Sequence, residues 1–548
     1  MGGFLRTVVG GGRRISPVAA RHDLAAGVVG QPTGARWARF CTWCEGGSPI
    51  GPRWDPPRIV ALVAYRSISW LISDAARRDP DRPAITCGDE TVSRLELDLR
   101  TNRMARAFAA MGVTQGSLVT IALPNSVAFL EAAVAAWKLG AIPQPVSYRL
   151  PDRERQAIVE LADSALVVGA EPSAHPTRRV VRQGWEPDAG LSDDPLPDII
   201  SPSWKAPTSG GSTGRPKLIL SGAPGTFHED GPGMKFYRIK PNGVSCAPGP
   251  LYHSAPFQVS SLSLFGGGHV VLMSKFDAEE TLRAVDTYRP DLLLLVPTMM
   301  SRIWRLPEAV RTQYDLSSLE VIWHMAAPCP VWLKQAWIDW LGGEKIYELY
   351  AGTEAQAVTV VRGDEWTAHP GTVGRVSDGE MRVLDPDTHE DLPPGQIGEI
   401  FLRAKGKPTY HYRGAEPHRI DDGWESLGDM GWFDAEGYLF LGDRKADMIL
   451  SGGANIYPAE TESALLEHHT VVSCAVIGLP DEDLGKRVHG VIQLTPDHGL
   501  DDPDAEMRAF LAERLVRYKI PRTFEYVDTP VRDDAGKVRR SGLVAERG

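Results

Sequence analysis

The feature of this sequence that most constrains its fold is a repeated order of short apolar strand, amphipathic helix and short apolar strand. The order is found at residues 118–143 and again at residues 156–168, 281–296 and 319–341. Strands joined by crossover helices in this rhythm indicate a parallel sheet. Residues 292–296 are apolar throughout, which predicts a strand buried on both faces. We therefore expect an α/β fold, with parallel sheets in a large N-terminal domain.

The amino-acid composition changes near residue 370, where Gly, Pro and Asp become frequent. Short strands at residues 381–384, 398–402 and 437–441 predict a small β-rich region with hairpin turns. A compact tail follows, with helices predicted over 460–468 and 505–516 and strands over 473–477 and 488–494. We place the N-terminal domain at residues 66–442, a hinge at 443–447 and a small, mobile α+β domain at 448–548.

Residues 1–60 differ from the rest of the chain, because they are basic, poor in acids and rich in Gly and Pro. This composition predicts a disordered extension without a function of its own. A transit peptide and a start codon assigned too far upstream are the alternatives. Cys41 and Cys44 form a CxxC without a second pair at zinc-site spacing, which argues against metal or redox chemistry there.

Bulk composition excludes several classes of protein. With a net charge of −11 over 548 residues, the chain lacks the basic footprint of a nucleic-acid-binding protein. It has no apolar run of about 18 residues, so no integral membrane segment is expected. Six cysteines are few for this length and indicate free thiols in a reducing compartment, which predicts a cytoplasmic protein. Nothing in the sequence indicates an oligomeric state.

A glycine-rich stretch at residues 209–217, Ser-Gly-Gly-Ser-Thr-Gly-Arg-Pro-Lys, is the strongest local signal for ligand binding. Glycines let backbone N–H groups turn toward an anion, the hydroxyls add donors, and Lys217 adds a positive charge. These features predict a loop that holds a polyphosphate, with a flexible linker as the alternative. It is not a Walker loop, because Leu218 follows Lys217 where Ser or Thr is required.

Two further stretches carry residues suited to nucleotide binding. Tyr350, Thr353 and Glu354 end a predicted strand, and they offer a ring for a base, a hydroxyl for a phosphate and a carboxylate for Mg²⁺. Asp429 lies in a glycine-flanked turn, where it can accept hydrogen bonds from ribose hydroxyls. An exposed strand edge and an ordinary Asp turn are the alternatives.

Charges and glycines also gather near the C-terminus. Arg444 and the Ser-Gly-Gly stretch at 451–453 lie at the predicted domain junction, which suggests a hinge and a backbone surface for a ligand. Lys537 lies in a basic segment close to the end of the chain. Solvated surface charge is the alternative for this segment.

In their order along the chain these motifs resemble those of the adenylate-forming superfamily. That group includes acyl- and aryl-CoA synthetases, peptide-synthetase adenylation domains and firefly luciferase. The resemblance runs from about Arg66 to Arg540 and is closest in motif form to bacterial fatty-acid or bile-acid and steroid-acid CoA ligases. It implies an ATP-dependent, Mg²⁺-requiring acid–thiol ligase. Such an enzyme activates a carboxylic acid as an acyl-adenylate, releases pyrophosphate and transfers the acyl group to coenzyme A.

The resemblance also implies a role for each matching residue. The phosphates of ATP would be held by Ser209, Gly211, Ser212, Thr213, Gly214 and Lys217. The nucleoside would be held by Tyr350 and the backbone of Ala326, Ala327 and Pro328 at the adenine, and by Asp429 and Arg444 at the ribose. Thr353 would contact phosphate, Glu354 would bind Mg²⁺, and Lys537 would be the catalytic lysine. Coenzyme A would contact Ser451, Gly452 and Gly453.

The chain departs from the family pattern at Gly210, commonly Ser, at Ala351, usually Gly, and at Ala446, commonly Asp or Lys at the pivot. The implied acyl pocket would be lined by His253, Phe257, Trp323 and Met325. Small residues near this pocket predict room for a hydrophobic acid of fatty or bulky steroid and bile-acid type. Alternatives are an aryl-acid CoA ligase, a luciferase-like use of the adenylate, and a non-catalytic protein that binds acyl-AMP.

Overall fold

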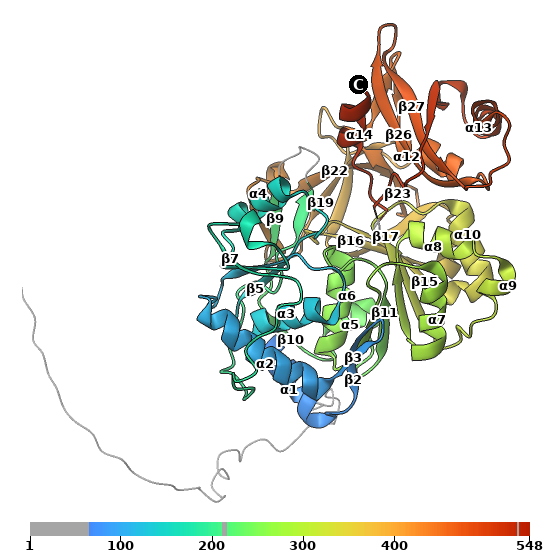
Figure 1. Cartoon of the computed structure of the whole chain (residues 1–548). Helices are drawn as coiled ribbons and strands as arrows, with labels where there is room; N and C mark the ends of the chain where they lie inside the picture. Colours follow the sequence, from blue (N-terminus) through green and yellow to red (C-terminus); the bar gives the residue numbers. More distant parts are fainter. Residues whose placement is uncertain (1–64, 211–215, 534–535) are drawn as a thin grey trace, which may run out of the picture. The chain divides into compact units, whose positions relative to one another are not determined.

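The computed structural model of the protein describes residues 65–210, 216–533 and 536–548 (Figure 1). The predicted extension and four predicted phosphate-loop residues, Gly211, Ser212, Thr213 and Gly214, lie outside these described residues. Helices and strands alternate through the described chain, which confirms the predicted α/β class with a smaller C-terminal domain. No helix among the described residues is both long and apolar enough to span a bilayer.

The largest sheet has a parallel centre with the strand order β2-β12-β11-β13-β14-β15. Its strands are Pro83–Cys87 (β2), Val244–Ala247 (β11), His269–Leu272 (β12), Leu292–Leu295 (β13), Val321–Met325 (β14) and Ile346–Ala351 (β15). The connecting helices are Ser254–Phe265 (α6), Ala278–Tyr288 (α7), Pro297–Trp304 (α8), Glu308–Arg311 (α9) and Val331–Leu341 (α10). Every residue of β13 is buried, as the apolar run predicts.

A second, four-stranded parallel sheet has the order β5-β4-β6-β7. Its strands are Leu118–Ile121 (β4), Ile142–Pro145 (β5), Leu166–Val168 (β6) and Arg179–Val181 (β7), and its helices are Arg94–Ala110 (α2), Val127–Lys138 (α3) and Asp152–Ala162 (α4). Ser93 fixes the start of α2, because its hydroxyl accepts from the Glu96 backbone N–H while the Glu96 carboxylate accepts from that of Ser93. Helix α1 (Ile68–Arg78) and strand β3 (Glu90–Ser93) precede α2.

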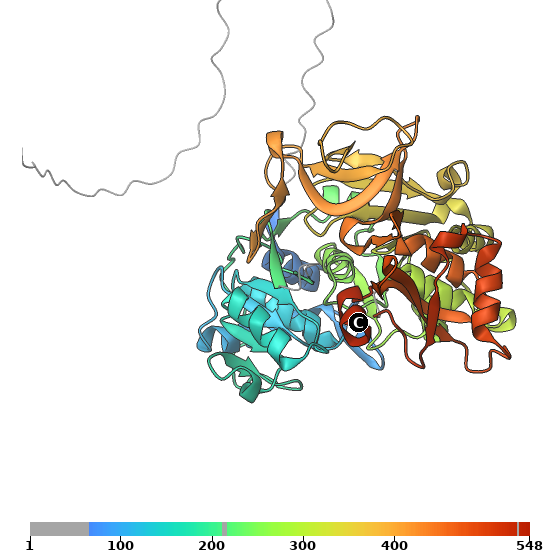
Figure 2. The same ribbon diagram turned by 90° about the horizontal axis from the view of Figure 1, so that it is seen from above.

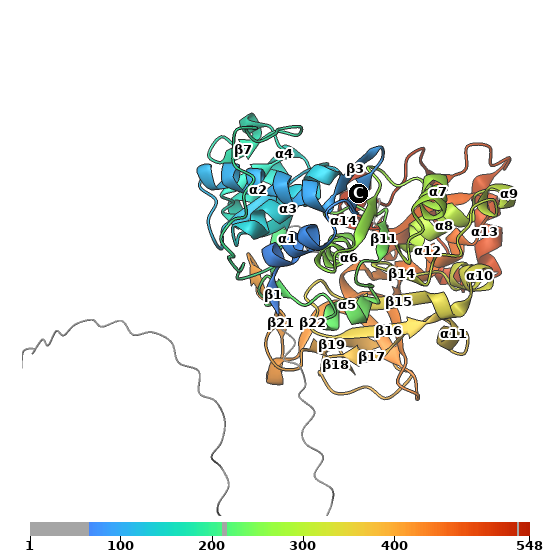
Figure 3. The ribbon, with the colours of Figure 1, turned by 90° about the horizontal axis from the view of Figure 1, so that it is seen from below.

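Antiparallel strands extend the largest sheet beyond β15. They are Val358–Arg362 (β16), Thr372–Asp378 (β17), Glu380–Leu384 (β18), Gly398–Arg403 (β19), His418–Arg419 (β21), Glu425–Phe433 (β22) and Leu439–Arg444 (β23), and α11 (Gly363–Trp366) follows β16. Figure 2 shows how strongly the strands of this part are curved, and Figure 3 shows β14, β15, β16 and β17 side by side. The predicted β-rich region with its hairpins is therefore present, and it continues the main sheet.

Three small sheets complete the N-terminal part and the start of the C-terminal part. Strand β1 (Arg66–Ser67) pairs with β10 (Thr226–Phe227), and α5 (Pro232–Tyr237) follows β10. Strand β9 (Pro216–Ser221) lies between β8 (Thr208–Gly210) and β20 (Tyr410–Arg413). Strands β24 (Ile449–Ser451) and β25 (Ala454–Ile456) form a hairpin after the short 3₁₀ helix Lys445–Asp447. The β8-β9-β20 sheet carries Lys217, which is one of the residues predicted for the phosphate site.

The C-terminal residues build a separate hydrophobic core on the sheet β26-β27-β28. Its elements are Pro458–Leu466 (α12), Val471–Asp481 (β26), Gly485–Leu494 (β27), Pro503–Ala512 (α13), Thr523–Tyr526 (β28) and Arg540–Arg547 (α14). Helix α13 ends at Ala512, four residues before the predicted end at Val516. The predicted boundaries at 442, 443–447 and 448 stay predictions.

Candidate active site

The centre of the candidate site is a contact between Lys217, Glu354 and Tyr412. Lys217 lies on β9, Tyr412 on the neighbouring β20, and Glu354 in the turn after β15. The Lys217 ammonium donates to Tyr412 Oη at 2.7 Å and to Glu354 Oε1 at 3.3 Å. Tyr412 donates its own hydroxyl hydrogen to the same Glu354 oxygen. Three distant parts of the chain thus place one cation and one carboxylate side by side.

Burial sets the charge states in this contact. Only 5% of Glu354 is exposed to solvent. Burial and the negative charge of Glu354 raise the pKa of Tyr412, so its hydroxyl stays protonated and acts as a donor. The Lys217 ammonium also lies 4.0 Å from the centre of the Tyr412 ring, where the electron-rich face of the ring attracts it. The aromatic residue therefore orients both charged partners.

A tight turn presents Thr353 and Glu354. A Cβ added at Gly352 would lie 2.3 Å from Leu427 Cδ1 and 2.9 Å from Glu354 Oε2, so a larger residue would have to displace both side chains. Ala355 has a φ of 54°, a left-handed conformation that a residue other than Gly adopts at a cost of about 1–3 kcal/mol. Thr409 donates its hydroxyl to the backbone carbonyl of Glu354 at 2.7 Å, which helps to hold the strained turn.

A second cluster joins Tyr350, Asp429 and Arg444, as the predicted nucleoside site requires. Tyr350 at the end of β15 donates its hydroxyl to Asp429 Oδ2 at 2.9 Å. Asp429 and Arg444 are cross-strand partners on β22 and β23, and Arg444 Nε donates to Asp429 Oδ1 at 3.1 Å. Burial and Asp429 raise the pKa of Tyr350 well above its usual value, while Asp429 raises the pKa of Arg444. Their roles toward adenine and ribose stay predictions.

The backbone after β14 is also unusual. Ala326 has a φ of 75° and is exposed, and Ala327 and Pro328 follow it in an irregular bend. Strand β14 pairs with β15, so this bend and Tyr350 leave the sheet at neighbouring strand ends. Irregular backbone at the carboxyl ends of parallel strands is where ligands bind in open α/β sheets. The geometry therefore suits the predicted adenine contact.

Lys537, the predicted catalytic lysine, lies near both clusters. Its backbone N–H donates to Asp533 Oδ1 at 2.9 Å, and a Cβ added at the preceding Gly536 would lie 3.2 Å from Thr298. Surrounding protein atoms desolvate the ammonium and lower its pKa, although part of the side chain stays exposed. The charges of Glu354 and Arg444 also act on this pKa, in opposite directions. Lys537 therefore lies within the electrostatic influence of Glu354 and Arg444, and a Cβ added at the preceding Gly536 would lie 3.8 Å from Ala327.

The residues predicted for the acyl pocket are one histidine and three buried hydrophobic residues. His253 precedes α6, and its Nε2 lies 3.7 Å from Asp533 Oδ2. Burial and then the charge of Lys537 lower the pKa of His253 to about 3, so its ring is neutral near pH 7. Phe257 is fully buried and packs against aromatic residues of the core. Trp323 and Met325 lie on β14 and are also buried, so the acyl-pocket assignment stays a prediction.

The predicted coenzyme A residues form a reverse turn. Ser451 ends β24, and Gly452 and Gly453 have φ values of 57° and 82°. Two central residues with positive φ are typical of a type I′ hairpin turn, which strongly favours glycine. The Gly452 N–H donates to the carbonyl of Leu484, in the turn between β26 and β27. The turn is therefore built on its own domain, and its role toward coenzyme A stays a prediction.

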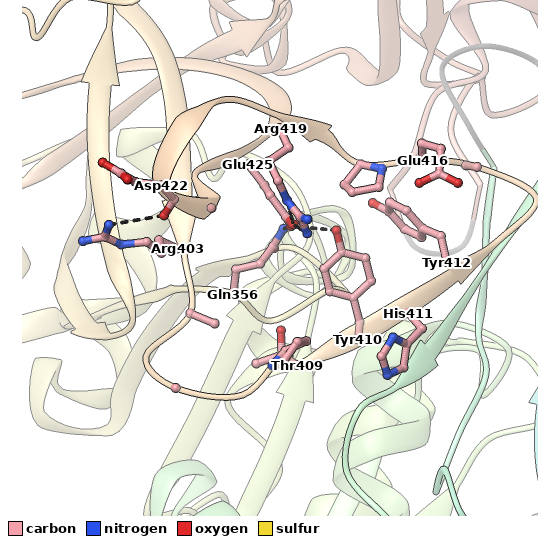
Figure 4. Close-up of a pocket in the computed structure, with 16 residues that line it drawn as sticks. Gln356, Arg403, Thr409, Tyr410, His411, Tyr412, Glu416, Arg419, Asp422 and Glu425 are labelled. Atoms are coloured by element: carbon pink, nitrogen blue, oxygen red, sulfur yellow. Dashed lines mark hydrogen bonds and ion pairs between the residues drawn. The ribbon is translucent and has the colours of Figure 1, made fainter.

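A cavity of about 640 Å³ lies beside the central contact and is lined partly by Tyr412. In Figure 4, Gln356, Tyr410 and Arg419 surround the carboxylate of Glu425. Gln356 and Tyr410 donate to Glu425 Oε2 at 2.8 and 2.7 Å, and Arg419 donates to its other oxygen. None of the residues predicted for the acyl pocket lines this cavity.

Sequence reasoning missed Tyr412 and Thr409. Tyr412 is 195 residues from Lys217 in the chain, and no motif connects the two positions. The alternating aromatic and polar residues at 410–413 predict only a short strand. It missed Lys205 as well, a buried lysine that follows Trp204 in an irregular segment. A lone lysine between a tryptophan and a Pro-containing stretch gives no sequence signal of burial.

Comparison with known proteins gives a consistent result. The family described as AMP-binding enzyme matches residues 72–407, and the AMP-binding enzyme C-terminal domain matches residues 460–537. A feruloyl-CoA synthase of Amycolatopsis sp is 32% identical over 86% of this chain and 96% of its own. A 2-succinylbenzoate–CoA ligase of Bacillus licheniformis is 26% identical over 87% of this chain and 99% of its own. Among solved structures, ATP-bound MatB from Rhodopseudomonas palustris is 26% identical with a TM-score of 0.72, covering 87% of this chain and 98% of MatB.

Proposed function

Because this chain belongs to the family of AMP-binding enzymes, we propose that it is an ATP-dependent acid–CoA ligase. In the first half-reaction the substrate carboxylate attacks the α-phosphorus of ATP, and the bond to pyrophosphate breaks. In the second, the thiol of coenzyme A attacks the carbonyl of the acyl-adenylate, loses its proton and expels AMP. The nucleophile in each step belongs to a substrate, so the protein supplies position and charge.

The observation that carries this proposal is the convergence of charged groups around Glu354. Lys217 contacts Glu354 directly, and Lys537 lies near enough for Glu354 to act on its pKa. Arg444 and Asp429 form a second ion pair, and burial together with the charge of Arg444 lowers the pKa of Lys537. Phosphoryl transfer builds negative charge on oxygens, and positioned cations stabilise that charge.

In our proposal Lys217 and Thr353 hold the phosphates, with Ser209 and the loop 211–214. Asp429 and Arg444 hold the ribose, and Tyr350 and the backbone at 326–328 hold the adenine. Lys537 contacts the acid and the α-phosphate. Glu354 fits a Mg²⁺ ion, because it is a buried carboxylate with oxygen chemistry that this ion prefers. The ion, when bound, neutralises charge on the phosphates.

The second half-reaction needs coenzyme A at the adenylate. We propose that the small domain turns about residues 443–447, removes Lys537 and brings the turn of Ser451, Gly452 and Gly453 to the thiol. Glycines with positive φ support this role, since they leave the backbone open to a close ligand. Ala446 lies in the 3₁₀ helix Lys445–Asp447, at the position that the resemblance assigns to the pivot, and we propose that its charged neighbours Lys445 and Asp447 set the pivot.

For the substrate we favour an aromatic carboxylic acid over a fatty or steroid acid. Trp323 packs with Tyr237 and Tyr347 at ring-centre distances of 6.0 and 5.1 Å, next to the predicted acyl pocket. Offset aromatic rings suit a flat aromatic ligand. The feruloyl-CoA synthase relative is named for such an acid, which supports the choice. Free cysteines at 87, 246, 329 and 474 support the proposed cytoplasmic location.

Pyrophosphate release over a panel of aromatic, fatty and steroid acids tests the proposal. We expect acid-dependent release that is fastest with an aromatic acid, and acyl-CoA formation when coenzyme A is added. Release without acyl-CoA would favour an adenylate-forming enzyme without thiol transfer. An oxygen-dependent product would indicate luciferase-like chemistry, and tight acyl-AMP binding without turnover would indicate a binding protein. Fastest release with fatty or steroid acids would contradict the aromatic assignment.

A further inference from the structure

Lys205 is a buried lysine without an acidic partner. Only 6% of the residue is exposed. Its ammonium donates to Ser254 Oγ at 3.0 Å and to Gln258 Oε1, and it lies 4.6 Å from the centre of the Trp204 ring. All of these groups are neutral, and no ion pair is found for Lys205 among the described residues. Burial lowers the pKa of Lys205 to about 7.

Two other buried lysines show what is missing at Lys205. The ammonium of Lys138 pairs with Asp98 at 2.6 Å, and that of Lys334 pairs with Glu348 at 2.5 Å. Buried charges in proteins are normally paired in this way, because an unpaired one is costly to desolvate. Lys205 therefore differs from Lys138 and Lys334 because no negatively charged side chain is paired with it among the described residues.

The groups around Lys205 offer further donors. Ser254 Oγ accepts from Lys205, so its own hydroxyl hydrogen is left to donate. Tyr237 Oη accepts from Gln258 Nε2 at 3.1 Å, so its hydroxyl hydrogen is left as well. Among the described residues no acceptor is found for either hydrogen. The Lys205 ammonium and the hydroxyls of Ser254 and Tyr237 can therefore donate hydrogen bonds to a ligand group that only accepts them.

This group of residues lies beside residues predicted for the acyl pocket. Ser254, Gln258 and Tyr237 are each only partly buried. Ser254 follows His253, whose ring lies beside Asp533 and within the influence of Lys537. On the other side, Trp323 Nε1 donates to the backbone carbonyl of Tyr237 at 2.9 Å.

We infer that Lys205, Ser254 and Tyr237, held together by Gln258, form a subsite for a second carboxylate carried by the acid substrate. This inference rests on the proposed function and narrows its substrate class to acids with two carboxylates. One carboxylate is activated near Lys537, and the other is bound by the subsite through one ion pair and two hydroxyl hydrogen bonds. A bound carboxylate supplies the charge that Lys205 lacks and holds it as an ammonium.

A matched pair of acids tests the subsite. We compare 3-phenylpropanoate with its ring-carboxylated forms, using the ortho, meta and para isomers, and measure kcat/KM for pyrophosphate release. We expect the wild-type protein to prefer at least one ring-carboxylated acid by about 10- to 100-fold, as is usual for hydrogen bonds to charged groups. Lys205→Met should abolish that preference, so that its kcat/KM values for 3-phenylpropanoate and for the ring-carboxylated acids agree within about twofold. Lys205→Arg should retain part of the preference.

The control is Lys138→Met, which removes a paired buried lysine far from the subsite residues in the chain. It should lower the melting temperature and leave the acid preference unchanged. Ser254→Ala gives a second variant, with a partial loss of preference, should Lys205→Met fail to fold. A wild-type protein that uses all the acids equally overturns the inference while the proposed function stands. The absence of pyrophosphate release with every acid of the wider panel rejects the proposed function itself.

Discussion

Glu354 shows how one side chain in this site depends on residues far away in the sequence. Its carboxylate accepts from Tyr412, which is 58 residues further along the chain, and from Lys217, which is 137 residues before it. Its backbone carbonyl accepts from Thr409. A carboxylate fixed in this way is positioned before any ligand arrives, and preorganised charge is what phosphoryl transfer needs.

Tyr412→Phe tests this positioning. The variant keeps the ring beside Lys217 but removes the hydroxyl that joins Lys217 to Glu354. We expect kcat/KM for ATP to fall about 10- to 100-fold, because the lost hydrogen bonds involve charged partners. Steady-state kinetics at saturating acid measure the effect.

Tyr410→Phe is the matched control for this experiment. Tyr410 lies two residues away on β20 and donates to a different buried carboxylate, that of Glu425. Its loss should reduce the melting temperature while kcat/KM for ATP changes less than about threefold. Equal kinetic losses in the two variants would show that Tyr412 has no special relation to the site.

At the scale of elements, a buried ion pair supports the strand ends that carry the site. Lys334 on α10 pairs with Glu348 on β15, and both are buried. The ring of His324 on β14 lies 3.9 Å from the same carboxylate oxygen, and burial lowers its pKa well below the usual value. The pair thus ties α10 to β15, which ends at Ala351, and lies beside β14, which ends at Met325.

Lys334→Met leaves the Glu348 carboxylate buried without a partner. We expect a loss of about 3–5 kcal/mol in the free energy of unfolding, because removing one member of a buried ion pair leaves the other charge buried without a partner. The double variant Lys334→Met with Glu348→Gln should recover part of that loss. Urea unfolding followed by tryptophan fluorescence measures both. A double variant less stable than Lys334→Met would contradict the account.

A buried histidine in the main sheet makes stability depend on pH. His269 Nε2 lies 2.8 Å from Thr86 Oγ1, and burial, with a further effect of Arg82, lowers the pKa of His269 to about 4. The unfolded chain takes up this proton near pH 6.5 and the folded chain only near pH 4. The neutral ring therefore stabilises the fold fully above pH 6.5, and this contribution is lost as the pH falls toward 4.

His269→Gln keeps an amide for Thr86 and removes the titration. We expect the variant to lose about 2 kcal/mol less stability than the wild-type protein between pH 7 and pH 5, at about 1.36 kcal/mol per pKa unit. The difference is read from urea unfolding at the two pH values. His411→Gln, on an exposed residue of β20, serves as control and should behave as the wild-type protein does. Parallel losses in the wild-type protein and His269→Gln would refute the assignment.

The elements predicted well are those whose signal is local. The apolar run at 292–296 predicts β13, and the short strand predicted at 398–402 is β19 at Gly398–Arg403. The pairing of distant strands is not local: β17 pairs with β23 across about seventy residues, at Thr372 and Phe440, and β9 pairs with β20. Periodicity does not encode such partners, and for that reason the contact of Tyr412 with Lys217 was missed.

At the scale of the whole molecule, the C-terminal residues contact the rest of the chain close to the site. Arg305, directly after α8, donates to the carbonyls of Leu466 and His469 at 3.2 and 3.0 Å, at the end of α12. His253 Nε2 lies 3.7 Å from Asp533 Oδ2. In this arrangement the charge of Glu354 acts on Lys537, while the Gly452 N–H donates to the carbonyl of Leu484.

Lys537→Ala separates the two half-reactions. We expect acyl-adenylate formation to fall about 10²- to 10³-fold, because a charged group is lost from the transition state. Thioester formation from supplied acyl-adenylate should change less than about threefold. Rapid-quench assays measure each step. Lys486→Ala, an exposed lysine on β27, is the control and should leave both rates unchanged. Equal losses in both steps would argue against an alternation between two domain arrangements.

The transfer of labelled oxygen tests the central claim most directly. The substrate acid is prepared with ¹⁸O in its carboxylate and incubated with the protein, ATP, Mg²⁺ and coenzyme A. If the carboxylate attacks the α-phosphorus, one ¹⁸O atom must remain on AMP when the thiol expels it. Mass spectrometry should therefore find one labelled oxygen in AMP and none in pyrophosphate. Unlabelled AMP, or label in inorganic phosphate together with ADP, would contradict an acyl-adenylate mechanism for this protein.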